Sequence, residues 1–192
     1  MTKKTLNQNS KFAEEILNFI EPDFIFNNKP INRLKMSENN NLNNNQNKTA
    51  KLIELKKKIS SIENCILKNE SKNLVIGDGN IDSPIMLIGE TPGKLEDESG
   101  CTFQGEVGSL LDKMLMAINI NRKDVYSTYS VNFRTPSDRK PTSQEIKRYS
   151  IFLKEHVLII DPKIIILMGS SAMEALTGIN SKISSERGKW KE

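Results

Sequence analysis

One stretch of the chain combines residue types and spacings that suit the binding of a flat ligand. It begins with Gly89-Glu90-Thr91-Pro92-Gly93, continues through Glu96-Asp97 and ends with Gly100, Phe103 and Gly105. The glycines permit close backbone approach, the proline stiffens the turn, and the phenyl ring offers a face for stacking. The stretch therefore predicts one wall of a pocket for a planar molecule.

The elements around this stretch place it at a sheet edge. The apolar run 85–88 predicts a strand that ends at the glycine turn, and further strands are expected at 125–131 and 164–168. Helical periodicity appears at 107–118, 143–160 and 171–176, and this alternation predicts a parallel α/β sheet flanked by helices. Ligands of such sheets bind at the carboxyl ends of strands.

Three details of these elements make testable expectations. The continuously apolar run 164–168 predicts a buried central strand. Thr142 and Glu145 form a capping-box pattern at a helix start. The helix 107–118 carries an apolar set that is expected to face the core, namely Leu110, Leu111, Met114, Leu115 and Ile118.

The first third of the chain differs in composition from the rest. An amphipathic helix is expected from Asn9 to about Glu21, and a second helix from Lys48 to about Glu63. Between them the segment 39–47 is almost pure asparagine, which predicts a low-complexity linker. We therefore expect an N-terminal helical segment at 1–38, a linker at 39–47 and an α/β domain at 48–192.

Bulk composition narrows the class of protein. The 192 residues are 36% hydrophobic and 27% charged, with net charge +4 and pI near 9.0, values that are compatible with nucleic-acid binding without proving it. No run is apolar enough to cross a membrane, and no secretory leader is visible. Two cysteines predict no disulfide framework, so a cytoplasmic location is expected.

The stretch described first resembles the opening motif of the family-4 uracil-DNA glycosylases. Nine positions are in register with that motif: Gly89, Glu90, Pro92, Gly93, Glu96, Asp97, Gly100, Phe103 and Gly105. Thr91, Thr102 and Gln104 depart from it, the last two where proline and valine are usual. The resemblance extends from about Cys65 to Trp190.

This resemblance implies an enzyme of base excision repair that hydrolyses the N-glycosidic bond of uracil in single- or double-stranded DNA. Such an enzyme extrudes the base into a tight pocket and stabilises the departing anion. Glu90 or Glu96 would place the attacking water, and Phe103 would stack on the uracil. Gly89, Thr91, Pro92 and Gly93 would line the uracil, as would position 129.

Position 129 is where this sequence departs most from the pattern of the family. The family has an asparagine there that reads the uracil edge, and this chain has Tyr129. A phenol cannot supply the paired donor and acceptor of a carboxamide. Strand alternation places Asn132 on the opposite side, so it is not expected to compensate.

The family's histidine and cluster ligands are also not matched. The His-Pro segment implied by the resemblance does not occur before Glu192, so we expect the last strand of the sheet to be missing, with possible self-association through the exposed edge. The single histidine, His156, is expected to be a surface or half-buried helix residue. The family's four [4Fe-4S] cysteines correspond to Ile62, Cys65, Phe133 and Tyr149, so only Cys65 matches and no cluster is expected.

The best sequence candidate for DNA contact is the loop that follows the second strand. It carries three cations, Arg134, Arg139 and Lys140, which suit phosphate contacts. Two readings follow from the sequence. The chain is a uracil-excising glycosylase, or it is an inactive relative that keeps the scaffold and at most binds DNA weakly.

Overall fold

The computed structural model describes residues 33–190 of the chain, with side chains described from residue 47 onward. The chain divides into two compact units, Met1–Asn40 and Asn41–Glu192, and the side-chain contacts given below lie within the second. The helix expected at 9–21 lies outside the described residues. The helices and strands are α2 (Arg33–Ser60), α3 (Ile66–Glu70), β1 (Asp78–Gly79), β2 (Ile85–Gly89), α4 (Lys94–Ser99), α5 (Gly105–Met116), β3 (Tyr126–Tyr129), α6 (Ser143–Ile160), β4 (Ile164–Leu167), α7 (Ser170–Thr177) and α8 (Ile183–Glu186).

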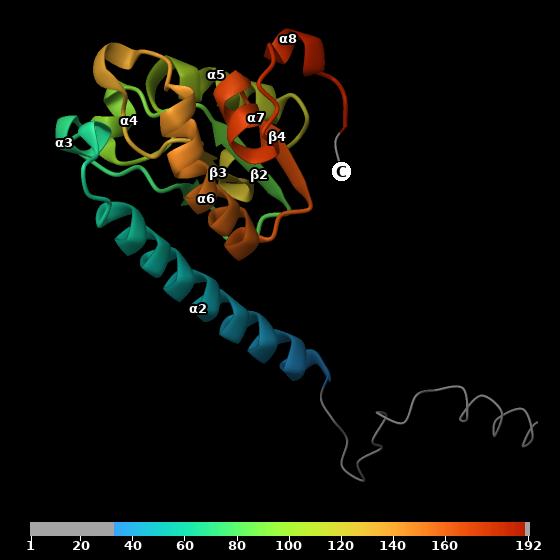
Figure 1. Ribbon diagram of the computed structural model, residues 1–192. Coiled ribbons are helices and arrows are strands. Elements are labelled where there is room, and N and C mark those ends of the chain that lie inside the picture. The colour runs from blue at the N-terminus through green and yellow to red at the C-terminus, as the bar shows by residue number, and fades with distance from the viewer. Residues whose placement is uncertain (1–32, 191–192) are drawn as a thin grey trace, which may run out of the picture. The chain divides into compact units, whose positions relative to one another are not determined.

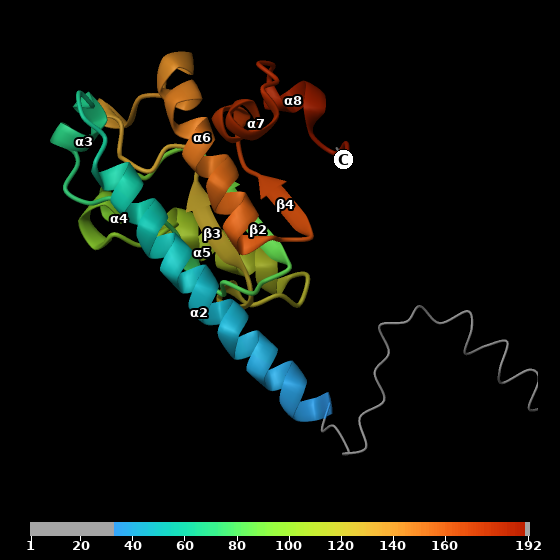
Figure 2. The ribbon, with the colours of Figure 1, turned by 60° about the horizontal axis from the view of Figure 1, so that its bottom comes forward.

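The sheet has four strands in the order β1-β3-β2-β4. β2 pairs in parallel with both β3 and β4, and the two-residue strand β1 adds an antiparallel edge. Helices α6 and α7 cover one face, since Met86 and Ile88 of β2 pack with Leu153 and Ala172. Helix α5 covers the other face, where Leu87 packs with Leu111 and Leu115. Figures 1 and 2 show this layering, which confirms the expected α/β fold.

Local sequence signals explain the best-predicted helix. α6 spans Ser143–Ile160, the range that the sequence predicts, because the Thr142 hydroxyl accepts a hydrogen bond from the Glu145 amide and the Glu145 carboxylate accepts one from the Thr142 amide. Asp161 in the left-handed conformation ends the helix.

The predicted position of the third strand is wrong. Among the described residues β4 lies at an edge of the sheet rather than at its centre, and Ile164 and Ile166 are 39% and 40% exposed. An uninterrupted apolar run fits either position, because Ile165 and Leu167 still pack against the α6 and α7 side. The sequence pattern carries no information on which strands become neighbours.

Two other expectations also need correction, and a third stays a prediction. Segment 39–47 lies within α2, because asparagine is only a moderately poor helix former; its role as a linker and the domain boundaries stay predictions. Leu110, Met114 and Ile118 are exposed, so of the expected apolar set only Leu111 and Leu115 reach the core. His156 is 2% exposed, because it lies on the core side of α6 and bonds the Tyr126 hydroxyl at 2.9 Å.

Candidate functional site

The glycine turn after β2 leads directly into a short helix. Gly93 caps α4, whose first turn holds Glu96 and Asp97, both buried. Burial of both carboxylates shows that they organise the surrounding backbone, because a buried carboxylate must be satisfied by donors.

The buried Glu96 carboxylate stabilises the loop through hydrogen bonds to its backbone. Its carboxylate accepts the Gly93 amide at 3.0 Å and the Gln104 amide at 2.8 Å, and the residue is 7% exposed. Both oxygens are therefore engaged in joining the two ends of the loop. Asp97 acts similarly toward the preceding segment, accepting the amides of Lys72 and Asn73.

Glu90, the other acidic candidate, points toward α7. Its Oε1 accepts the Ser171 amide at 3.0 Å, in the first turn of that helix. A Cβ on Gly169 would lie 2.4 Å from the Glu90 Cγ, so glycine is needed there for this side chain to fit. Glu90 is half-buried, which leaves it partly accessible to a water molecule.

Phe103 and Tyr129 lie together at the carboxyl end of the sheet. Their ring centroids are 5.0 Å apart, and the Phe103 amide donates to the Tyr129 hydroxyl at 2.9 Å. Tyr129 is 4% exposed, and its burial raises the pKa of the phenol. Gly89 lies against both rings, since a Cβ there would come within 2.7 Å of Tyr129 and 2.9 Å of Phe103.

Of the turn residues expected to line a base, Gly89 is the one that lies against the Tyr129 ring in the contacts described. Gly89 touches the two rings, Pro92 is buried, and Thr91 and Gly93 are half-buried. Asn132 is buried elsewhere, donating to the Val75 carbonyl at 3.0 Å, and so takes no part in this site.

The positions that match the family's cluster cysteines converge in one core. Cys65, Phe133 and Tyr149 are buried together, with Ile62 packed against them. The Cys65 sulfur lies 3.2 Å from the Tyr149 hydroxyl, and the Phe133 and Tyr149 rings pack edge to face at 6.2 Å. One thiol among an aliphatic and two aromatic side chains does not fit an iron–sulfur cluster, which needs thiolate ligands.

The loop expected to contact DNA binds its own carboxylates. Arg134 forms two bonds of 2.7 Å with Asp138, and Arg139 bonds both Glu145 oxygens at 2.7 and 2.9 Å. These pairs raise the pKa of both guanidinium groups. Lys140 is exposed, and no ion pair involves it within residues 47–190. The loop is thus less cationic than its arginine count suggests.

Two residues that the sequence did not single out, Asp78 and Arg122, lie near Phe103. Together with Thr102, Phe103 and the start of α5 they line a cavity of about 330 Å³. The departure of Thr102 from the motif was the available signal for this group, because a hydroxyl at a usual proline position requires a partner.

The fold and this loop define the class of the protein: an open α/β domain with its candidate site at the carboxyl edge of a parallel sheet. The model of the uracil DNA glycosylase superfamily matches residues 76–192. The chain belongs to this superfamily, which confirms the resemblance seen in the sequence.

Relatives in other organisms agree with this assignment. The chain is 38% identical to the type-4 uracil-DNA glycosylase of Thermotoga maritima, over 57% of each protein. It is 35% identical to that of Archaeoglobus fulgidus, over 64% of this chain and 62% of the relative. A DNA polymerase of Bacillus phage SP01 is 32% identical over 66% of this chain and 14% of its own length. The chain thus spans about three fifths of the glycosylases that it matches.

Within the described residues 33–190, no helix is both long and apolar enough to span a membrane.

Proposed function

We propose that this chain is a DNA-binding member of the uracil-DNA glycosylase family in which Tyr129 occupies the base pocket, so that uracil is not excised. The observation that carries the proposal is the Tyr129 ring itself. It lies 5.0 Å from Phe103 and against Gly89, the two residues that the family motif would use to enclose the base. A uracil ring and this phenol cannot share that volume.

The test uses the full chain with oligonucleotides that contain one uracil or one thymine at the same position. Binding is measured by fluorescence anisotropy and excision by alkaline cleavage of abasic sites. We expect binding of both oligonucleotides with equal affinity and no excision, because a closed pocket does not read the base. Excision by the unaltered chain that disappears in Glu90→Gln contradicts the proposal.

Replacing Tyr129 tests whether its ring is what fills the proposed base pocket. Tyr129→Asn removes the ring and introduces a carboxamide donor and acceptor, so it should bind the uracil oligonucleotide about tenfold more tightly than the unaltered chain does, a value within the usual energy of base stacking. Tyr129→Phe is the matched control, because it keeps the pocket filled and should show no gain in affinity. An unchanged affinity of Tyr129→Asn for the uracil oligonucleotide would indicate that Tyr129 does not occupy a base site.

The second candidate function is hydrolysis of the glycosidic bond of uracil in base excision repair. It is supported by the register of Glu90, Glu96 and Phe103 with the family motif and by the similarity to proteins named type-4 uracil-DNA glycosylase. This reading requires the Tyr129 side chain to leave the pocket when DNA binds. The excision assay above decides between the two candidates.

We propose that phosphates contact the loop with Arg134, Arg139 and Lys140. A phosphate would compete with Asp138 and Glu145 for the two arginines, whereas Lys140 is available directly. Lys140→Gln should therefore lower the salt dependence of DNA binding by about one unit of slope, equally for uracil and thymine oligonucleotides. An unchanged slope would place the DNA elsewhere on the molecule.

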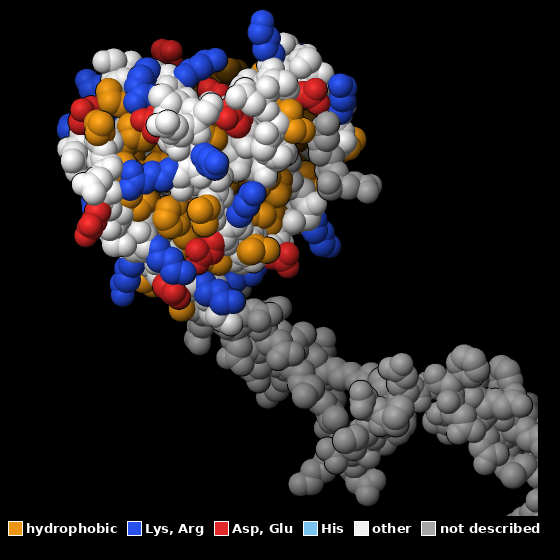
Figure 3. Space-filling view, in the orientation of Figure 1, with side chains coloured by type: hydrophobic (Ala, Val, Ile, Leu, Met, Phe, Trp, Pro, Cys, Tyr) orange, Lys and Arg blue, Asp and Glu red, His pale blue; other side chains and the backbone are white. Residues whose placement is uncertain are grey.

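We also propose that copies of the chain associate through the outer edge of β4. That edge has no neighbouring strand within the described residues, and its exposed Ile164 and Ile166 lack a charged neighbour in the strand. Figure 3 shows apolar side chains gathered near the middle of another face, the one that α6 covers, among scattered cations. Ile166→Lys should lower the apparent mass in sedimentation at high concentration, and an unchanged mass would contradict the proposal.

Free Cys65 and Cys101 support a reducing location such as the cytoplasm.

A further inference from the structure

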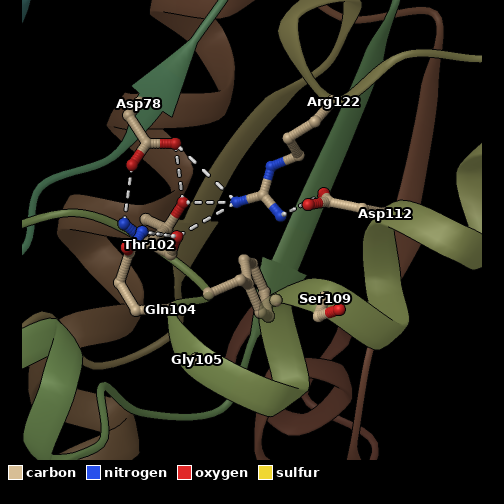
Figure 4. Close-up of a pocket in the computed structure, with 9 residues that line it drawn as sticks. Asp78, Thr102, Gln104, Gly105, Ser109, Asp112 and Arg122 are labelled. Atoms are coloured by element: carbon tan, nitrogen blue, oxygen red, sulfur yellow. Dashed lines mark hydrogen bonds and ion pairs between the residues drawn. The ribbon is translucent and has the colours of Figure 1, made fainter.

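A polar network supports the loop that carries Phe103 (Figure 4). Thr102 donates to Asp78 twice, from its amide at 2.6 Å and from its hydroxyl at 2.7 Å. Arg122 donates from Nη2 to the Thr102 carbonyl at 3.2 Å and to the Thr102 hydroxyl oxygen at 2.9 Å. The Thr102 hydroxyl thus joins an acidic and a basic side chain that come from different elements.

Arg122 also reaches the aromatic ring of the site. Its guanidinium carbon lies 5.0 Å from the centroid of Phe103, which is the geometry of a cation–π interaction. Its Nη1 is buried without a hydrogen-bond partner among the described residues, and the Asp112 carboxylate lies 3.9 Å away. The Arg122 guanidinium therefore holds the backbone at Thr102 and also lies against the ring of the next residue, Phe103.

The backbone at Phe103 needs this support. Phe103 has a φ of +47°, in the left-handed region that a bulky residue adopts only when its surroundings hold it there. The family motif has a proline before this position, whereas a proline at 102 would have no amide to donate to Asp78. Hydrogen bonds that Thr102 donates to Asp78 and accepts from Arg122 thus take the place of a rigid ring in this chain.

We propose that Arg122 is a positioning residue that acts through Thr102 to hold Phe103 against Tyr129, and so keeps the base pocket closed. The inference rests on the proposed function for the meaning of the closed pocket. Loss of Arg122 frees the loop, so the Phe103 amide no longer stays on the Tyr129 hydroxyl and the Tyr129 ring becomes accessible to solvent.

The three tyrosines of the chain provide the readout. Tyr126, Tyr129 and Tyr149 are all buried, so each should resist nitration by tetranitromethane in the folded full chain. In Arg122→Ala, we expect nitration of Tyr129 alone, mapped by mass spectrometry, to accelerate about tenfold or more, because two charged hydrogen bonds are lost. Thr102→Val, which keeps the side-chain shape and removes the hydroxyl, should give a smaller increase at the same residue, and Arg122→Lys should restore part of the protection.

Arg148→Ala is the matched control. Arg148 also donates to two backbone carbonyls, those of Glu63 and Asn64, and lies away from the Phe103 loop. It should leave Tyr129 unreactive. An unreactive Tyr129 in Arg122→Ala overturns the proposal, and so does equal nitration of all three tyrosines, which would indicate general unfolding. Failure of the proposed function would appear differently, as uracil excision by the unaltered chain.

Discussion

At the scale of single residues, the site shows how family positions can keep their identity while their task shifts. Glu96 is in register with the motif, but its carboxylate is engaged by two backbone amides. Tyr129 replaces an amide with a ring that fills the space beside Phe103. The retained Glu96 thus maintains the shape of the loop, while the Tyr129 ring fills the space between Gly89 and Phe103.

Glu96→Gln should destabilise the fold through this loop. A glutamine offers one acceptor oxygen, so its NH₂ group would face one of the two amide donors from Gly93 and Gln104. We expect the free energy of unfolding to fall by about 1–3 kcal/mol in urea denaturation, the usual cost of an unsatisfied buried group. Glu98→Gln, at an exposed ion pair with Lys72, should change it by less than about 0.5 kcal/mol. Equal changes in the free energy of unfolding for the two substitutions would show that the Glu96 carboxylate does not stabilise the loop.

Sequence reasoning identified the motif residues because they depend on local spacing, and it missed the residues that meet only in space. Asp78 and Arg122 are separated from Thr102 by 24 and 20 residues. His156 was a different kind of error, because its spacing from Tyr149, Leu153 and Ile160 already follows the buried side of α6. Its polar character outweighed that periodicity in the prediction.

At the scale of elements, predictions succeeded where a local signal sets the boundary. The strand at 85–88 and the helix at 143–160 were predicted with nearly their observed ranges, because a glycine turn and a capping box mark their ends. The order of the strands was not predictable in this way. β4 became an edge strand through pairing with β2, which is distant in the sequence.

The cap of α6 should contribute measurably to stability. Thr142→Ala removes the hydroxyl that accepts the Glu145 amide, so we expect a loss of about 1 kcal/mol in the free energy of unfolding. Ser143→Ala is the control, since that exposed serine lies one residue inside the helix. A loss equal to that of the control would mean that the Arg139–Glu145 pair alone holds the helix start.

At the scale of the whole molecule, one core joins the segments that the family's metal cluster would connect. Cys65 after α2, Phe133 after β3 and Tyr149 in α6 pack with Ile62 at a single place. We propose that this protein folds without iron, because van der Waals packing there replaces coordination bonds. Anaerobic reconstitution with iron and sulfide should give no 400 nm absorption band, whereas a band that disappears in Cys65→Ser would contradict the proposal.

The buried His156 should make the stability of the whole domain depend on pH. Burial lowers the pKa of His156 from 6.5 to about 4, so the folded protein binds fewer protons than the unfolded chain between these values. Stability is therefore complete above pH 6.5 and falls as the pH drops toward 4, by about 3 kcal/mol in total. Glu145 acts in a lower window, because its pair with Arg139 lowers its pKa from 4.5 to about 2.

The pH ranges over which His156 and Glu145 affect stability can be separated experimentally. Urea denaturation at several pH values should show a loss of stability between pH 6.5 and 4.5 that is absent in His156→Gln, which carries no titrating group. Since His156 is the only histidine of the chain, its ring protons also report the native pKa directly by NMR. A native pKa near 6.5 would mean that the imidazole is accessible to water, and the buried pairing of His156 with Tyr126 would then be incorrect.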